Sequence, residues 1–161
     1  MIPRRRVERE RAGGVRLRLS RREREVLRGL AAQLGARLAH EDDASDLRRL
    51  FPPGYTDDAE DEGEYRRLVH DELVAGRREA LRTFATTLDR QELSEEELDA
   101  WLSVLNDLRL VLGTRLDVTE ETFARPLDPR DPDAAELAVY GYLSWLQEQA
   151  VEAAAARPRR T

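Results

Sequence analysis

The chain has 161 residues, of which 40% are hydrophobic and 37% charged, with a formal net charge of −6 at pH 7. Cysteine is absent and only two histidines are present, which excludes disulfides, thiol catalysis and thiolate metal sites within these residues. The apolar fraction is too high for a fully disordered chain, and the length suits one domain. We expect a single domain over residues 1–161, with a hairpin and basic arm at 1–19, a helical bundle at 20–156 and a tail at 157–161.

Charge is unevenly distributed along the chain. Residues 1–28 hold eleven Arg against four Glu, a local charge of +7. Residues 41–64 hold ten acidic residues against Arg48 and Arg49, a local charge of −8. Opposite blocks of this kind can lie against each other, or each can face a partner, and the sequence leaves both alternatives open.

The sequence shows no sign of a membrane segment. No apolar run approaches the roughly 18–20 residues that a membrane-spanning helix needs. The start of the chain, MIPRRRVERERAGG, lacks the apolar region of a secretory signal. We therefore expect a cytoplasmic protein with no membrane contact.

The first predicted element is a β-hairpin. Val15, Leu17 and Leu19 alternate with arginines at the period of two that is typical of a half-buried strand. A Gly-Gly pair at 13–14 supplies the positive φ angles of a tight turn, and residues 7–11 would form the partner strand.

Two helices are predicted next, separated by the acidic block. Ser20 and Glu23 form a capping box that opens a helix ending near Ala39. Residues 46–51 could form a short helix before Pro52-Pro53-Gly54, with Phe51 and Tyr55 anchoring the block to the core. Helical spacing of apolar residues then predicts a long helix over about 62–88.

Two further helices complete the chain. Ser94 and Glu97 form a second capping box, and Gly113 is a natural terminator of the helix that this box opens. Residues 116–118 could form a short extended piece, and Asp133 with Glu136 would cap a last helix reaching about residue 156. We therefore predict a mainly α fold, a helical bundle of four or five helices with an N-terminal β-hairpin.

The apolar residues of the last helix spread widely around its axis, which indicates burial on more than one side. Tyr142, Trp145 and Leu146 could leave an apolar face spare. The sequence does not decide whether that face meets the core, a partner or a second copy, so a homodimer stays open.

No catalytic or metal-binding motif is present. The two histidines, His40 and His70, lack the H-E-x-x-H or repeated Glu-x-x-His spacing, and the acidic run 57–64 lacks the spacing of a calcium loop. Phosphate-binding, dinucleotide-binding and nucleophile-elbow motifs are also missing. We therefore expect no enzyme activity, no cofactor and no metal.

Direct DNA binding stays open. The Arg-rich first 28 residues could neutralise phosphates. However, the pI of about 5.1 is acidic for a domain that binds DNA unaided. The predicted helices on either side of 89–93 also lack the short Gly-bearing turn of a helix-turn-helix.

Four polar residues stand in the apolar end of the helix that begins after Ser94: Asn106, Asp107, Arg109 and Arg115. We expect an ion pair of Asp107 with Arg115 or Arg109, and a bond from Asn106 to a loop backbone, because buried polar groups need partners. The alternative is contact with a ligand or a partner.

The run WLSVLNDLRLVLGTRLDV at 101–118, with LFPPGYTDD at 50–58 and YGYLSWLQ at 140–147, resembles an actinobacterial family long catalogued as a domain of unknown function. The family is described as AosR-like oxidative-stress transcriptional regulators, and the resemblance covers nearly the whole chain. The positions that match its motif are Trp101, Asn106, Asp107, Arg109, Gly113, Arg115 and Asp117. A redox switch through a thiol pair is implied for some members, but this chain has no Cys to form one.

The resemblance implies a regulatory protein that contacts the transcription machinery, such as a sigma factor or RNA polymerase. We expect a partner to be steered by the basic hairpin, through Arg16, Arg18, Arg21 and Arg22, and by the acidic block. The alternative is an adaptor for regulated proteolysis, because genes of the family often lie near a Clp-protease adaptor.

Overall fold

The computed structural model describes residues 5–39 and 63–158 of the chain. Within these ranges it contains three short strands and four helices: β1 (Val7–Arg9), β2 (Val15–Leu17), α1 (Arg21–Ala39), α2 (Gly63–Thr87), β3 (Glu92–Leu93), α3 (Glu95–Arg115) and α4 (Ala134–Ala155). The prediction of a mainly α fold with an N-terminal hairpin is confirmed. The short helix expected at 46–51, its neighbours Phe51 and Tyr55, and nearly all of the acidic block lie outside the described residues.

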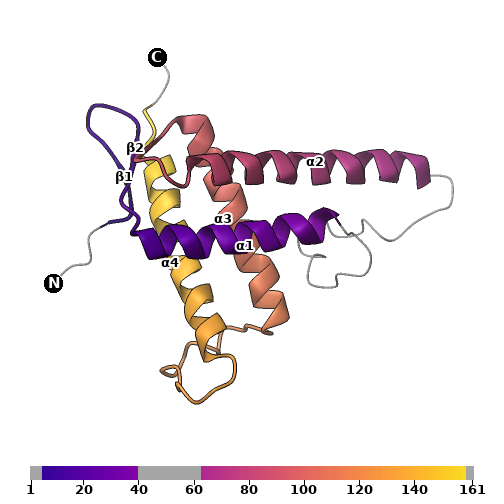
Figure 1. The fold of residues 1–161 in the computed structure, drawn as a ribbon, viewed down its shortest axis with the longest axis vertical. Helices are drawn as coiled ribbons and strands as arrows, with labels where there is room; N and C mark the ends of the chain where they lie inside the picture. The colour runs from indigo at the N-terminus through magenta and orange to yellow at the C-terminus, as the bar shows by residue number, and fades with distance from the viewer. Residues whose placement is uncertain (1–4, 40–62, 159–161) are drawn as a thin grey trace.

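The helices form two pairs that cross each other (Figure 1). α3 and α4 pack side by side, and α1 and α2 form a second pair that lies across them. The first half of α2 extends beyond the α3–α4 pair. Leu68, which belongs to the predicted apolar stripe of α2, is accordingly 65% exposed. Helical spacing alone therefore overestimates the buried length of this helix.

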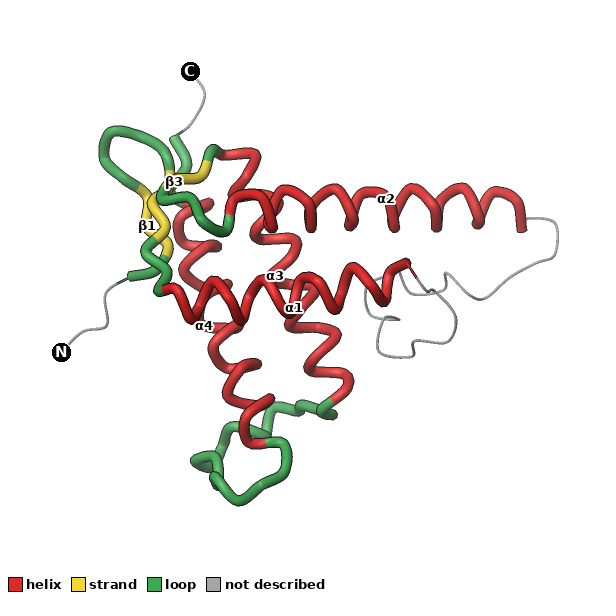
Figure 2. Tube along the Cα trace, in the orientation of Figure 1, coloured by secondary structure: helices red, strands yellow, loops and turns green. Residues whose placement is uncertain are grey.

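The strands form one antiparallel sheet in the order β1-β2-β3, at the end of the molecule where α1 begins and α4 ends (Figure 2). Val7 pairs with Leu17 across the hairpin, and β1 ends at Arg9 because residues 10–14 form the turn. Gly13 and Gly14 have φ angles of 97° and 83°, the left-handed conformation that the sequence predicted. The third strand was not predicted, because a two-residue strand has no periodicity of its own and exists only by pairing Leu93 with Val15.

Both capping boxes are confirmed. The Glu23 amide donates to Ser20 Oγ at 3.1 Å, and the Glu97 amide donates to Ser94 Oγ at 3.1 Å. In the second box, Glu97 also accepts from the Ser94 amide at 2.8 Å. Each box uses residues only three positions apart, so the sequence alone is enough to place these two helix starts.

Three predictions about the ends of α3 and α4 and the segment between them are wrong: one helix end, one extended piece and one cap. α3 does not stop at Gly113 but continues to Arg115, and Asp117 takes the left-handed conformation with φ 54°. Residues 116–118 form a turn and not an extended piece. Asp133 precedes α4 as expected but makes no side-chain cap bond; its own amide instead donates to Asp131 Oδ1 at 2.8 Å.

One hydrophobic core joins all the elements. Its largest fully buried side chains include Trp101, Phe84, Leu98, Leu105 and Leu146, and the sheet adds Val7, Val15 and Leu93. Because the hairpin contributes buried residues, it belongs to the core and is not a detached arm. Among the described residues, no helix is long and apolar enough to cross a membrane.

Candidate interaction surface

Trp101, the first residue of the motif, lies in the core between α2 and α3. Its indole is fully buried, and its ring centroid lies 4.4 Å from that of Phe84. The indole Nε1 donates to Thr87 Oγ1 at 2.7 Å, at the end of α2. Trp101 therefore joins two helices and is not accessible to a partner in the folded chain.

Asp107 forms a buried ion pair, but not with either expected partner. Its carboxylate is hydrogen-bonded to Arg77 of α2, and Asp107 is only 3% exposed. Burial raises the pKa of Asp107, and the Arg77 guanidinium opposes that rise. The expected partner Arg109 is two residues away and faces another side of the helix. The other, Arg115, donates to Glu136 of α4 at 2.7 Å.

The remaining motif residues lie where α3 meets α4 and the loop between them. Asn106 Oδ1 accepts from Gln147 Nε2 at 3.3 Å, so it bonds a side chain of α4 rather than a loop backbone. Gly113 is buried against Tyr140, and a Cβ at this position would lie 2.9 Å from the ring. The Arg109 Nε is buried with no hydrogen-bond partner in the described part of the chain. The motif is thus used mainly to hold α3 between α2 and α4.

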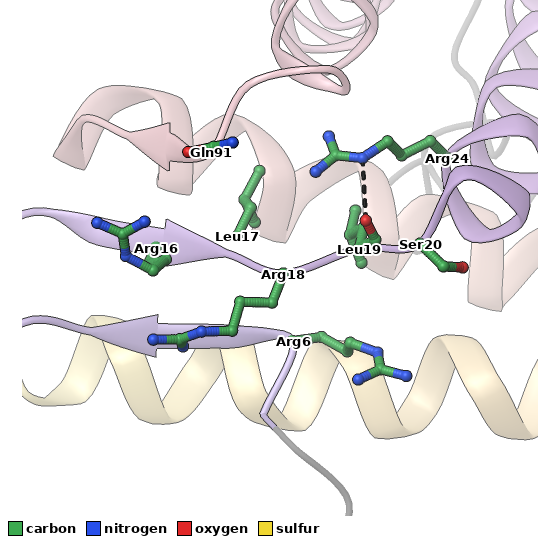
Figure 3. Close-up of a pocket in the computed structure, with 8 residues that line it drawn as sticks. All are labelled: Arg6, Arg16, Leu17, Arg18, Leu19, Ser20, Arg24 and Gln91. Carbon is green, nitrogen blue, oxygen red and sulfur yellow. Dashed lines mark hydrogen bonds between the residues drawn. The ribbon is translucent and has the colours of Figure 1, made fainter.

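The basic residues near the N-terminus surround a hollow of about 680 Å³ beside β2 (Figure 3). Arg16 and Arg18 reach it from β2 and the residue after it, Arg6 from the segment before β1, and Arg24 from α1. Ser20 and Gln91 complete its polar lining. The strand alternation that placed Val15 and Leu17 in the core thus turns Arg16 and Arg18 outward.

Three of these four arginines are matched by carboxylates. Arg16 bonds Glu10 and Glu92, Arg18 bonds Glu8 at 2.7 Å, and Arg6 bonds Glu23 at 3.0 Å. The Arg16 guanidinium holds the pKa of the Glu10 carboxyl below its ordinary value. These glutamates come from the hairpin, β3 and α1, so the described structure accounts for much of the basic block without the acidic block at 41–64.

Arg24 is different, because within the described residues it contacts only backbone carbonyls. Its Nε donates to the Leu19 carbonyl at 3.1 Å, and its Nη1 donates to the carbonyls of Leu88 and Arg90. It therefore satisfies backbone carbonyls just after the end of α2. Its charge is paired with no carboxylate of the described residues. The hollow keeps a positive charge for this reason.

Arg21 and Arg22 lie outside the hollow, in the first turn of α1. Arg21 is 95% exposed and lies 3.4 Å from Glu25, one turn along the helix. Arg22 is also exposed. Cations are unfavourable at the N-terminus of a helix, where the macrodipole is positive. The macrodipole therefore disfavours both cations, and for Arg21 the exposed pair with Glu25 offsets part of this cost.

A cluster that sequence reasoning missed joins the hairpin, α1 and α4. Tyr142 donates to Glu23 at 2.7 Å, Arg6 lies 5.9 Å from the ring centroid of Trp145, and Gln149 Oε1 accepts from the Arg6 and Val7 amides at 2.7 and 3.2 Å. Burial, with the nearby Glu23 carboxylate, raises the pKa of Tyr142. Residues 142, 145 and 149 are spaced so that they lie on one face of a helix. The polar groups of Tyr142 and Gln149 on that face were the only signal in the sequence that it contacts other elements.

Of the three residues that could leave an apolar face spare on α4, one is buried in the core and two are half-buried, so a homodimer stays a prediction. Leu146 is fully buried, and Tyr142 and Trp145 are engaged by Glu23 and Arg6. In the described ranges, no group of three or more His, Cys, Asp or Glu side chains is placed to hold a metal ion.

Comparison with known proteins places these features in a family. The chain is 33% identical over 122 residues to the oxidative stress regulator AosR of Mycobacterium tuberculosis, and equally to that of Mycobacterium bovis. Each match covers 65% of this chain and 56% of the relative, so the chain spans only about half the length of these proteins. No solved structure matches. Because residues 4–154 match the model of the family described as Domain of unknown function (DUF2017), the chain belongs to that family.

Proposed function

We propose that this chain is a non-enzymatic regulator of an oxidative-stress response that acts by protein–protein contact with the transcription machinery, a sigma factor or RNA polymerase. Its membership of the family and its similarity to proteins named oxidative stress regulators support the first part. The contact surface is the basic face formed by the hollow and by Arg21 and Arg22 at the start of α1.

The observation that carries the contact surface is the position of Arg21 and Arg22. Both are exposed, and both stand where the helix dipole disfavours a cation. Arg24 adds a third positive charge nearby. Among the described residues, no carboxylate forms an ion pair with it. Exposed side chains that the helix dipole disfavours are expected to have a role in binding. Together the three arginines would attract an acidic surface of a partner.

The test is a crosslinked pull-down from nuclease-treated lysate of the source cells, with and without peroxide, analysed by mass spectrometry. The wild type is compared with Arg21→Glu/Arg22→Glu and with the control Arg125→Glu/Arg130→Glu. The control changes the charge equally, on exposed residues of the loop between α3 and α4. Glutamates in the first turn favour a helix, which offsets the loss of the exposed Arg21–Glu25 pair, so the test variant should keep its fold.

We expect the wild type and the control to recover RNA polymerase or a sigma factor, and the Arg21→Glu/Arg22→Glu variant to lose about tenfold of that recovery. Equal recovery by all three would show that the basic face is not the contact surface. Recovery of Clp protease subunits in place of transcription proteins would overturn the proposal in favour of a proteolysis adaptor.

A further inference from the structure

A groove runs along the seam between α1 and α2, apart from the hollow and from the motif on α3. One part has a volume of about 380 Å³, and its floor consists of the small or apolar residues Ala31, Ala32 and Gly35 of α1 and Leu81 and Ala85 of α2. A second part of about 390 Å³ continues toward Leu38 and Val74. Both parts are lined by Arg78 and Arg82, so they form one groove.

The edges of the groove are basic. Arg28 reaches it from α1, and Arg78 and Arg82 from α2. Arg28 is paired with Asp89 and Arg82 with Glu79 at the surface, where such pairs contribute little and can exchange partners. Arg78 is exposed and has no carboxylate partner among the described residues. Among the described residues that line the groove, Asp71 at the far end is the one acidic residue.

The size and shape of the groove suit an α-helix. Along α1 it extends from Arg28 to Ala39, twelve residues whose ends are about 17 Å or three helical turns apart. Small residues on the floor let the backbone of a third helix approach to ordinary packing distance, and its apolar side chains would fill the space between α1 and α2. A nucleic acid could contact only the arginines at the edges, because the apolar floor offers no hydrogen-bond partner to phosphates or bases, whereas an apolar helix face would also fill the floor.

We infer that the α1–α2 groove binds an amphipathic helix of a partner protein, one whose apolar stripe is flanked by glutamates or aspartates. The apolar stripe packs on Ala32, Gly35 and Ala85, and the flanking carboxylates meet Arg28, Arg78 and Arg82. The surface is continuous with the basic face, since Arg24 and Arg28, one turn apart on α1, both contact the end of α2. The assignment rests on the proposed function, because it names the partner chemistry of a protein that acts by contact.

The test uses a fluorescein-labelled synthetic peptide of about 14 residues, about four helical turns, with Leu at every third or fourth position and Glu on both sides of that stripe. A second peptide carries Arg in place of every Glu. Binding to the full chain is measured by fluorescence anisotropy. The groove variants are Arg78→Glu, which removes the cation without a described partner, and Ala85→Trp, which fills the floor; their matched controls are Arg125→Glu and Ala138→Trp, both at exposed positions away from the groove.

We expect the Glu peptide to bind and the Arg peptide not to bind. Each groove variant should raise the Kd of the Glu peptide about tenfold or more, and each control should change it by about twofold or less. Circular dichroism of every variant confirms that the helices are intact. Equal effects of groove and control variants, or equal binding of both peptides, would overturn the inference.

Two other occupants are tested in separate experiments. If Ala85→Trp and Arg78→Glu convert a wild-type dimer into a monomer in sedimentation, the groove binds a second copy and the inference is wrong. If a synthetic peptide of residues 41–62 displaces the probe as well as the unlabelled Glu peptide does, the chain's own acidic block is the occupant and the inference is also wrong. Failure of the peptide to bind, with transcription proteins still recovered in the pull-down, overturns the groove and leaves the proposed function standing.

Discussion

At the scale of single residues, the buried hydroxyl of Thr87 is fully used. Its Oγ1 accepts from the Trp101 indole at 2.7 Å and donates within α2, to the Thr83 carbonyl at 2.7 Å or the Phe84 carbonyl at 3.1 Å. The neighbouring Thr86 is exposed, and its hydroxyl donates only to the Thr83 carbonyl at 3.1 Å. The two threonines thus differ in one contact: Thr87 accepts a hydrogen bond from α3, whereas Thr86 bonds only within α2.

Thr87→Val should lower the free energy of unfolding by about 1–3 kcal/mol, because it leaves the buried indole N–H of Trp101 without an acceptor. Thr86→Val is the matched control and should change stability by about 0.5 kcal/mol or less. Urea unfolding followed by circular dichroism measures both. Equal effects of the two substitutions would contradict this role of Thr87.

The two sides of the Asp107–Arg77 pair should respond differently to substitution. The carboxylate side chain is 4% exposed and the arginine side chain 21%, so the carboxylate depends more on its partner. Arg77→Met should lower the free energy of unfolding at pH 7 by about 3 kcal/mol, because it leaves a buried carboxylate unpaired. Asp107→Asn should be nearly neutral, because burial already disfavours the ionised form. Urea unfolding measures both, and a larger loss from Asp107→Asn would contradict this account.

The same pair predicts a pH dependence. Burial raises the pKa of Asp107 above that of the unfolded chain, so its stabilising contribution is complete at acidic pH and is lost as the pH rises through the raised pKa. The difference in unfolding free energy between the wild type and Asp107→Asn should therefore shift in favour of the wild type as the pH falls from about 7 to about 4. Unfolding curves at several pH values measure this difference. A shift in favour of the variant would mean that Arg77 lowers the pKa more than burial raises it.

At the scale of elements, two helical glycines have opposite environments. Gly76, inside α2, has nothing within 4 Å of the place where a Cβ would stand. Gly113, inside α3, faces the Tyr140 ring, which in turn stacks on Phe123 with ring centroids 5.8 Å apart. Only the second glycine has a packing role, the close approach of α3 and α4.

Gly76→Ala should therefore raise the free energy of unfolding by about 0.5–1 kcal/mol, since alanine is the better helix former. Gly113→Ala should lower it by about 1–3 kcal/mol, because the helix preference is outweighed by the shift forced on Tyr140. Thermal unfolding of the two variants provides the comparison. A gain in stability for Gly113→Ala would show that Tyr140 moves aside at little cost.

At the scale of the whole molecule, the exposed arginines that the binding tests change, Arg21, Arg22 and Arg78, lie apart from the contacts that build the fold. The motif on α3 connects α2 with α4, and the cluster around Glu23 connects the hairpin with α1 and α4. The hollow beside β2 and the groove between α1 and α2 meet where Arg24 and Arg28 contact the residues just after α2. Charge changes at Arg21, Arg22 and Arg78 can therefore alter binding without removing the contacts of the core.

These 161 residues contain no Cys, and Met1 is the only sulfur-containing residue. We expect peroxide to leave the helical circular dichroism signal unchanged and the Tm within about 1 °C, because there is no thiol to oxidise. Any effect of peroxide on the pull-down must then come from the partner. A shift in Tm that is reversed by a thiol reductant would contradict this prediction, and a catalase-treated sample is the control.

The sequence by itself determined the elements whose signals are local. The boxes Ser20–Glu23 and Ser94–Glu97 specify helix starts through bonds three residues apart, and Gly13-Gly14 specifies the hairpin turn. Tertiary structure decided what depends on contacts distant in sequence: Arg77 as the partner of Asp107, Leu93 in a third strand, and Gly113 inside α3 against Tyr140. The groove was also decided by the tertiary structure. In the sequence of α1 or of α2 alone its alanines indicate only a helix, and they form the floor of a groove only when the two helices pack together.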